Sequence, residues 1–282
     1  NNFFCQKMFK IQNLIFLFLI IALSNDLIQA ENKTNELKSN VIVGANQISN
    51  YENLIVDKRI GIIANHTSVI FKNDKSHTHL VDSLLSLNFN IKKIFAPEHG
   101  FRGKEPNGAN IDDEIDLKTG INIISLHGKN RSYGEIDDKD VQDIDVLIFD
   151  IQDVGVRFYT HISVLHYVME ASARNKIPLI ILDRPNPNAH YVDGPVLNLK
   201  NKSFVGMHEV PIVYGLTIGE YSKMINQEGW LKNKMKSEIH LVKLKNYNRN
   251  IIYELPINPS PNLPNKSSIN LYPSLCLFEG TN

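Results

Sequence analysis

Carboxylate, imidazole and guanidinium groups gather in one short stretch of this chain, residues 94–103, which reads I-F-A-P-E-H-G-F-R-G. An apolar run over residues 91–96 meets a proline and stops, which leaves Glu98, His99 and Arg102 on a glycine-containing loop. Ligands of open α/β sheets bind at the carboxyl ends of the strands. Glu98 is therefore the side chain that we expect to carry chemistry; the alternative is a solvated turn in which it only caps a helix.

Three more apolar runs end in polar residues in the same way. The run 59–64 is followed by Asn65 and His66, the run 144–149 by Asp150 and Asp153, and the run 179–182 by Asp183 and Arg184. If these strands are neighbours in one sheet, their ends converge on a single crevice. This convergence indicates a site more strongly than any one motif does.

The elements that must position these side chains alternate along the chain. Helical spacing of apolar residues over 78–89 and 162–173 separates the strand-like runs, and further short strands are expected at 122–126 and 240–244. Thr217 with Glu220 three residues later predicts a capping box at the start of a helix, so Glu220 is expected to be structural. The alternation predicts an α/β fold with a parallel, doubly wound sheet.

The two ends of the chain differ from its middle. Residues 1–30 read as a signal peptide with some upstream residues, because two lysines precede ten apolar residues, Leu14 to Leu23, and a cleavage-like Ala30. Ten apolar residues are too few to span a bilayer. We expect an exported bacterial protein, periplasmic or secreted, without a stable membrane anchor after signal cleavage.

The remaining chain divides into three parts by composition. Residues 31–40 are a polar N-terminal segment, and residues 41–255 are expected to form the α/β catalytic domain. Prolines crowd residues 256–282, which read as a linker and the start of a smaller, truncated C-terminal domain. We expect residues 31–282 alone to have little or no activity.

Charge and cysteine usage exclude several classes. Thirty basic side chains balance thirty acidic ones, so nothing indicates a nucleic-acid partner. The two cysteines, Cys5 and Cys276, cannot form a disulfide once the leader is removed.

Phosphate-binding and nucleophile motifs are absent from the sequence. There is no G-x-x-x-x-G-K-[ST] loop, and the first strand is followed by A-N-H-T-S in place of G-x-G-x-x-G, so we expect no nucleotide cofactor. There is no G-x-S-x-G nucleophile elbow either.

Paired carboxylates favour glycoside hydrolysis, which needs an acid for the leaving oxygen and a second group at the anomeric centre. Glu98 with Asp150 or Asp153 fits these roles by residue type, and His99 or Tyr159 could orient the substrate. The guanidinium groups of Arg102, Arg157 and Arg184 suit a substrate carboxylate, although each could instead form a structural ion pair. Asp183 is equally suited to capping a turn.

Metal-dependent hydrolysis is the rival chemistry. Possible ligands are His66, Glu98, His99, His127, Asp150 and His161. No H-E-x-x-H or close histidine pair at ligand spacing joins them, so we expect no metal site. His77 and His79 lie beside a polar turn and are expected to be solvated.

Five blocks of the sequence resemble one bacterial family. They are P-E-H-G-F-R-G (97–103), D-I-Q-D-V-G-V-R-F-Y-T (150–160), L-D-R-P-N-P (182–187), P-S-P-N-L-P (259–264) and L-F-E-G-T-N (277–282). Together they are similar to the family once known only as a domain of unknown function, DUF1343, which includes exo-β-N-acetylmuramidases of the NamZ type. The resemblance runs in order from about Val41 to the last residue. It implies a Rossmann-like N-terminal domain, a smaller C-terminal domain and an active site between them.

The resemblance also implies a reaction and its residues. The expected activity is release of terminal N-acetylmuramic acid from peptidoglycan-derived muramyl glycans, with Glu98 as the catalytic acid. Asp150, Asp153, Arg157 and Tyr159 would line the sugar site, and Asp153 or Tyr159 would orient the 2-acetamido group if its oxygen is the nucleophile. The full set of expected substrate-binding residues is Asn65, His66, His99, Arg102, Asp150, Arg157, Asp183, Arg184 and Glu279.

The sequence departs from the family pattern at His161, Val213 and Ser274, which bears on substrate preference more than on reaction class. Two alternatives stand beside the exo-muramidase reading. One is a metal-dependent amidase or esterase that acts on wall fragments. The other is a non-catalytic periplasmic protein that binds muramic acid.

Overall fold

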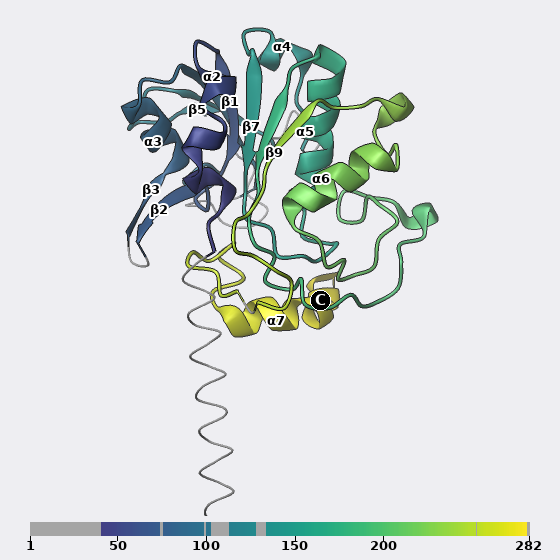
Figure 1. The fold of residues 1–282 in the computed structure, drawn as a ribbon. Helices are drawn as coiled ribbons and strands as arrows, with labels where there is room; N and C mark the ends of the chain where they lie inside the picture. The colour runs from purple at the N-terminus through teal and green to yellow at the C-terminus, as the bar shows by residue number, and fades with distance from the viewer. Residues whose placement is uncertain are drawn as a thin grey trace, which may run out of the picture. The chain divides into compact units, whose positions relative to one another are not determined.

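Six short apolar runs form the parallel part of a seven-stranded sheet, with the order β5-β6-β4-β1-β7-β8-β9 (Figure 1). The parallel strands are β1 (Ile60–Ala64), β4 (Ile91–Ala96), β6 (Asn122–Ser125), β7 (Val146–Asp150), β8 (Leu179–Leu182) and β9 (Ile239–Val242). Strand β5 (Glu114–Ile115) pairs antiparallel with β6 at one edge. The predicted α/β sheet is confirmed, and the four strands with polar ends are neighbours in the order β4-β1-β7-β8.

The coordinates are a computed structural model that describes residues 41–73, 76–98, 100–102, 113–127, 134–251 and 253–280. Val41 is also the first residue of one compact unit. The predicted signal peptide and the polar segment 31–40 lie outside the described residues. Within the described part of the chain, no helix combines the length and the apolar character that crossing a bilayer requires.

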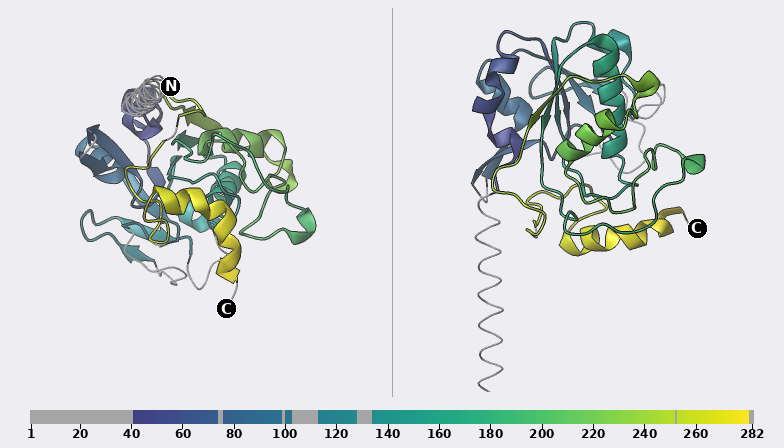
Figure 2. Two further views of the ribbon diagram at one scale, coloured as in Figure 1. Left: turned by 90° about the horizontal axis from the view of Figure 1, so that it is seen from below. Right: turned by 45° about the vertical axis from the view of Figure 1, so that its right-hand side comes forward.

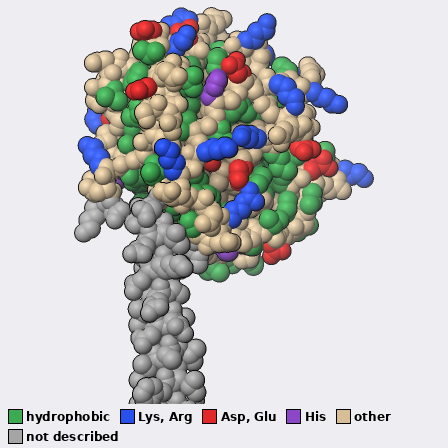
Figure 3. Space-filling view, in the orientation of Figure 1, with side chains coloured by type: hydrophobic (Ala, Val, Ile, Leu, Met, Phe, Trp, Pro, Cys, Tyr) green, Lys and Arg blue, Asp and Glu red, His purple; other side chains and the backbone are tan. Residues whose placement is uncertain are grey.

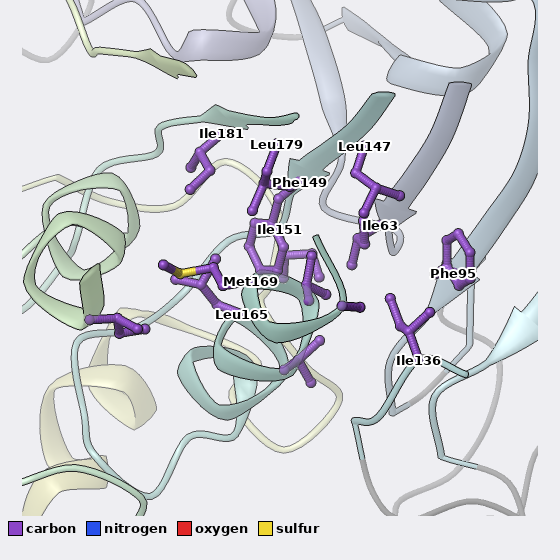
Figure 4. Packing of buried hydrophobic residues seen from close by; sticks show 14 of the residues in the cluster. Ile63, Phe95, Ile136, Leu147, Phe149, Ile151, Leu165, Met169, Leu179 and Ile181 are labelled. Carbon is purple, nitrogen blue, oxygen red and sulfur yellow. The ribbon is translucent and has the colours of Figure 1, made fainter. Parts of the chain in front are cut away.

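The central strands are buried on both faces, which explains why their sequences are almost continuously apolar. Alternate residues point to opposite sides, so Ile63, Leu147 and Phe149 join one hydrophobic cluster (Figure 4), and Ile62 and Ile148 join another. The first cluster includes residues of α4 (Asp138–Val141), α5 (His161–Asn175) and α6 (Ile218–Gln227), and the second includes residues of α2 (Glu52–Ile55) and α3 (Leu80–Ser86).

Helix starts follow local sequence signals. The predicted capping box of α6 is confirmed, because the Thr217 side chain accepts from the Glu220 amide and the Glu220 carboxylate accepts from the Thr217 amide. Asn265 and Ser268 form the equivalent box at the start of α7 (Lys266–Leu275).

Smaller elements complete the described chain. A hairpin of β2 (Val69–Asn73) and β3 (Ser76–His79) follows β1. Short 3₁₀ turns are η1 (Gly44–Asn46), η2 (Ile48–Asn50), η3 (Leu199–Asn201), η4 (Lys232–Lys234) and η5 (Cys276–Gly280). On the face drawn in Figure 3, basic and acidic side chains are interspersed, which agrees with the balanced charge of the sequence.

The strand order places a topological switch point beside β1. From β1 the chain first builds β4 and β6 on one side, and then returns to build β7, β8 and β9 on the other. The carboxyl ends of β1 and β7 flank this point, which is where ligands bind in folds of this kind. Helix α7 lies across the same end of the sheet, below the strands in Figure 1 and facing the viewer in the left panel of Figure 2.

Candidate active site

A cavity of about 400 Å³ opens at the carboxyl edge of the sheet. Four segments far apart in the sequence form its walls, with these lining residues: Glu98, Phe158, Tyr159, Thr160, His161, Val205, Ser260, Asn262, Leu263 and Tyr272. The lining combines apolar and aromatic side chains with a carboxylate, hydroxyls and an amide. A volume of this size is in the range of small-molecule sites.

Glu98 reaches the cavity because β4 ends two residues before it. The following turn closes with a bond from the Gly100 amide to the Pro97 carbonyl at 3.1 Å, and Gly100 has a φ of 72°, which favours glycine. Phe101 is buried behind the turn. Glu98 itself is half-buried, so its carboxyl group can meet a ligand in the cavity.

Tyr159 and His161 stand on the wall loop, the name used here for residues 151–160 together with His161, the first residue of α5. The Tyr159 hydroxyl donates to the Pro259 carbonyl at 2.9 Å, and its ring meets the His161 ring edge-on at 4.6 Å. Burial and the nearby Asp153 raise the pKa of Tyr159 well above its ordinary value, so the phenol stays neutral. His161 Nδ1 donates to the Gln152 carbonyl at 3.0 Å, because a carbonyl oxygen can only accept.

Asp153 lies at the root of the wall loop and is only 3% exposed. Its Oδ2 accepts from the Gly155 amide at 2.7 Å and from the Tyr214 hydroxyl. Burial raises the pKa of Asp153 to about 6, although these hydrogen bonds oppose the shift. We expected this carboxylate to contact the sugar; the structure instead places it behind the residues that line the cavity.

Asp150 and Arg184 form a sealed ion pair below the cavity. Arg184 donates two parallel hydrogen bonds to the Asp150 carboxylate, at 2.6 and 2.8 Å, and a third to the Val69 carbonyl at 3.0 Å. The Asp150 side chain is fully buried and that of Arg184 is 2% exposed. Both residues were expected to bind substrate, but here each satisfies the other and joins the end of β7 to the end of β8.

Asp183 and Asn65 also turn inward. Asp183 accepts from the Thr217 hydroxyl and from the Gly219 amide, both at 2.9 Å, and thereby caps α6; this is the turn-capping alternative stated above. Asn65 Oδ1 accepts from the Thr67 amide at 2.9 Å and from its hydroxyl. His66 Nε2 donates to the Asn258 carbonyl at 2.8 Å, which ties the end of β1 to the proline-rich segment.

Two arginines expected at the substrate carboxylate are held by the protein. Arg102 pairs with Asp116 at 2.8 Å and with Asp82 at 3.3 Å. Arg157 Nη1 donates to the carbonyls of Pro195 at 2.8 Å and Val210 at 2.6 Å. Neither residue lines the cavity. His99 lies outside the described residues, and so does the side chain of Glu279.

Several cavity residues were missed by sequence reasoning. Ser260 and Asn262 lie in the proline-rich segment, whose composition suggests a linker, and Tyr272 lies on α7. The P-S-P-N-L-P block was the available signal for the first two. The expectation for His79 is wrong: it is 9% exposed, caps α3, and burial lowers its pKa to about 4.

The described side chains offer no group of three or more histidine, cysteine, aspartate or glutamate residues that could hold a metal ion. Among the described lining residues the cavity presents one carboxylate, Glu98, together with hydroxyl and amide groups. A carboxyl group in such surroundings can donate a proton to a leaving oxygen and later take one from water.

Comparisons with known proteins place this chain among related sequences. Residues 60–267 match the family model described as "Exo-beta-N-acetylmuramidase NamZ, N-terminal". Peptidoglycan β-N-acetylmuramidase NamZ of Bacillus subtilis (strain 168) is 37% identical over 241 residues, which are 83% of this chain and 56% of that protein.

Two crystal structures of DUF1343 family proteins from Bacteroides fragilis NCTC 9343 are also similar. One has a TM-score of 0.76 at 46% identity and the other a TM-score of 0.74 at 34% identity. Each match covers 86% of this chain, and 63% and 60% of the respective relatives. The chain thus spans between half and two thirds of the length of these relatives.

Proposed function

Because this chain belongs to the NamZ family of exo-β-N-acetylmuramidases, we propose that it carries the acid-bearing cavity of a glycoside hydrolase that releases terminal N-acetylmuramic acid from peptidoglycan fragments. The observation that carries the proposal is the position of Glu98. It is half-buried in a cavity of about 400 Å³ at the sheet edge where ligands bind. Its neighbours there are the hydroxyl and amide side chains that sugar recognition uses.

Glu98 is the general acid in this proposal. It protonates the glycosidic oxygen as the bond to the anomeric carbon breaks, and its carboxylate then takes a proton from the attacking water. The second role falls to the substrate. Among the described residues that line the cavity, Glu98 is the one carboxylate; Asp150, Asp153 and Asp183 are not in the lining and bond to other parts of the protein.

The acetamido oxygen of the sugar is therefore the nucleophile that we propose. It attacks the anomeric carbon to give a cyclic oxazolinium intermediate, which water opens to free N-acetylmuramic acid. This route retains the anomeric configuration, because two displacements occur at the same carbon. Following the anomer first released by proton NMR distinguishes it from a single displacement by water.

We propose that neutral side chains, and not the arginines, bind the carboxylate of the substrate. Thr160, Ser260 and Asn262 line the cavity and offer hydroxyl and amide protons to the lactyl carboxylate. The aromatic rings of Phe158 and Tyr272, which also line it, suit the apolar face of a pyranose ring.

The experiment is the substitution Glu98→Gln, which keeps the shape of the side chain and removes the transferable proton. In the complete protein, turnover of a chromogenic β-glycoside of N-acetylmuramic acid should fall by about 10²- to 10⁴-fold. Glu52→Gln, at an exposed glutamate on α2, is the matched control and should leave turnover unchanged. Undiminished turnover in the Glu98 variant would contradict the role of Glu98 as the general acid.

The same assay separates the alternatives. Loss of activity on chelation, regained with metal, would favour a metal-dependent amidase or esterase. Saturable binding of N-acetylmuramic acid by an inert wild-type protein would favour a binding protein.

We also propose that the protein is exported, which the lysines and the ten-residue apolar run ahead of Ala30 support. N-terminal sequencing of the protein secreted from a bacterial host should start near Glu31. An uncleaved N-terminus in the cytoplasmic fraction would contradict export.

A further inference from the structure

Tyr214 lies outside the cavity lining, yet it contacts the root of the wall loop. Its hydroxyl donates to Asp153 Oδ2, and the two side chains are 5% and 3% exposed. The two residues are 61 positions apart in the chain. The contact therefore joins two segments that meet only in the folded protein.

The segment that carries Tyr214 clamps the wall loop at several points. Val213 forms a bridge with Val156, and the Arg157 amide donates to the Ile212 carbonyl at 2.8 Å. The Arg157 side chain then bonds the Val210 carbonyl at 2.6 Å. The hydrogen bond from the Tyr214 hydroxyl is the last of these contacts. It reaches Asp153, two residues before the turn at Gly155.

The Asp153 carboxyl group is asymmetric. The Gly155 amide and the Tyr214 hydroxyl both bond to Oδ2, whereas Oδ1 is buried and has no hydrogen-bond partner among the described residues. The bond from the Gly155 amide spans the turn between Asp153 and Gly155. The turn itself requires glycine, because Gly155 has a φ of 76° and a Cβ there would lie 2.1 Å from the Asn186 side chain. A change in the orientation of the Asp153 side chain should therefore alter the conformation of the turn and of the wall loop that follows it.

Besides Tyr214 and Gly155, the Val154 amide lowers the pKa of Asp153, and two further tyrosines interact with it electrostatically. Tyr159 stands on the wall loop and Tyr221 on α6, and burial raises the pKa of each far above neutral, so neither is charged. The ionised form of Asp153 therefore depends on the donors to Oδ2.

Tyr221 is a close structural counterpart of Tyr214. The two rings pack with their centroids 4.8 Å apart, but the Tyr221 hydroxyl meets His208 Nδ1 at 3.0 Å. That bond starts a chain in which His208 Nε2 meets His166 Nδ1 at 2.9 Å and His166 Nε2 meets Glu170 at 3.2 Å. The Tyr221 hydroxyl is therefore engaged by this histidine chain and not by Asp153.

We propose that Tyr214 is a positioning residue: its hydroxyl fixes the Asp153 carboxyl group, and through it the wall loop that carries Tyr159 and His161 into the cavity beside Glu98. The inference deepens the proposed function and, for its effect on hydrolysis, rests on it. Tyr214 touches no substrate in this role and acts only through Asp153.

The test compares Tyr214→Phe with Tyr221→Phe, since each variant keeps its buried ring and loses one hydroxyl. The pKa of Asp153 is read by ¹³C NMR of aspartate-labelled protein, with D153N to assign the signal. A hydrogen bond to a charged group is worth about 1.5–3 kcal/mol, so Tyr214→Phe should raise this pKa by about 1–2 pH units. Tyr221→Phe should leave it within a few tenths of a unit, on the order of an indirect effect.

A second readout follows the reaction. The acidic limb of kcat/KM should move up in pH by the same amount in Tyr214→Phe, and adding this change to D153N should have no further effect. If Tyr214→Phe folds poorly, 3-fluorotyrosine at position 214 replaces it; this residue keeps the ring and hydroxyl, is the stronger donor, and should lower the pKa of Asp153.

An unchanged pKa of Asp153 in both position-214 proteins would overturn the inference, and so would an equal shift in Tyr221→Phe. The titration needs no substrate, so the two proposals fail separately. A shift in proteins that do not hydrolyse the glycoside leaves the positioning role standing and removes the hydrolase. If the wild type hydrolyses the glycoside but Tyr214→Phe leaves the pKa of Asp153 unchanged, the hydrolase proposal stands and the positioning role is removed.

Discussion

Asp150 and Asp153 lie three residues apart at the end of the same strand, but the regions around them differ. Asp150 faces Arg184, which neutralises its charge and bonds both of its oxygens. In the part of the chain that the structure describes, Asp153 has no ion-pair partner: a tyrosine hydroxyl and a backbone amide bond to one oxygen, and no hydrogen bond reaches the other. The first region is a closed joint between β7 and β8, and the second supports the cavity.

The difference teaches how one sheet edge can hold both a structural and a functional carboxylate. Burial raises the pKa of Asp150 as well, but there the charge and the two hydrogen bonds of Arg184 oppose the shift. A buried carboxyl group without one keeps a pKa within reach of neutral pH and responds to each hydrogen bond that it gains or loses. Whether an aspartate at this edge is structural or functional depends on the groups that contact its carboxylate. Its position at the end of a strand does not reveal those groups.

The largest effect that would separate the two regions is expected from Arg184→Met. This change leaves Asp150 buried without its cation, so the free energy of unfolding should fall by about 3–5 kcal/mol, measured by urea denaturation. Adding D150N should restore much of the loss, because the uncompensated charge is then gone. A loss below about 1 kcal/mol, typical of surface pairs, would contradict the description of a sealed ion pair.

An exposed pair supplies the matched control. Arg59 and Asp145 are bonded at 2.7 Å, but their side chains are 45% and 32% exposed. Arg59→Met should leave the urea midpoint nearly unchanged, because water solvates the remaining aspartate.

A smaller effect is expected from D153N, through pH. Asp153 has a pKa raised from 3.8 to about 6, so its neutral form favours folding: this contribution is complete below pH 3.8 and is lost as the pH rises through about 6. The shift corresponds to about 3 kcal/mol as an upper value. The wild type should therefore lose more stability than D153N between pH 4 and pH 7, measured by urea denaturation at both values.

Taking the difference between the two proteins removes the other titrating groups. Asp183, whose pKa burial also raises to about 6, contributes equally to both. Parallel pH profiles for the wild type and D153N would show that Asp153 is paired like Asp150, which would end the comparison.

Much of the fold could be predicted from the sequence because its signals are local. Each central strand is a short apolar run with turn residues at its ends, and the capping box at Thr217 needs only four consecutive residues. The convergence of four strand ends also followed from the alternation of strands and helices, and the strand order confirms it.

The site was harder to predict because its contacts are not local. Residue type showed that Asp150, Asp183 and Arg184 stand at the edge, but not that they bond to one another and to α6. Tyr214 and Asp153 form a hydrogen bond although they are 61 positions apart in the chain. The proline-rich segment has the composition of a linker, but in the structure Tyr159 and His66 bond to its backbone. Of the three residues expected to be catalytic, Glu98 and Tyr159 line the cavity and Asp153 lies behind it.

The bond between Asp183 and Thr217 has a consequence for how relatives of this protein can diverge. It fastens the start of the excursion 184–216 to its end, so the excursion leaves the sheet and returns to it at one point. Insertions or deletions in its largely exposed part, residues 198–205, cost little, because loop-closure entropy grows only slowly with length. Since Val205 on this excursion lines the cavity, evolution can exchange one side of the cavity while the sheet stays as it is.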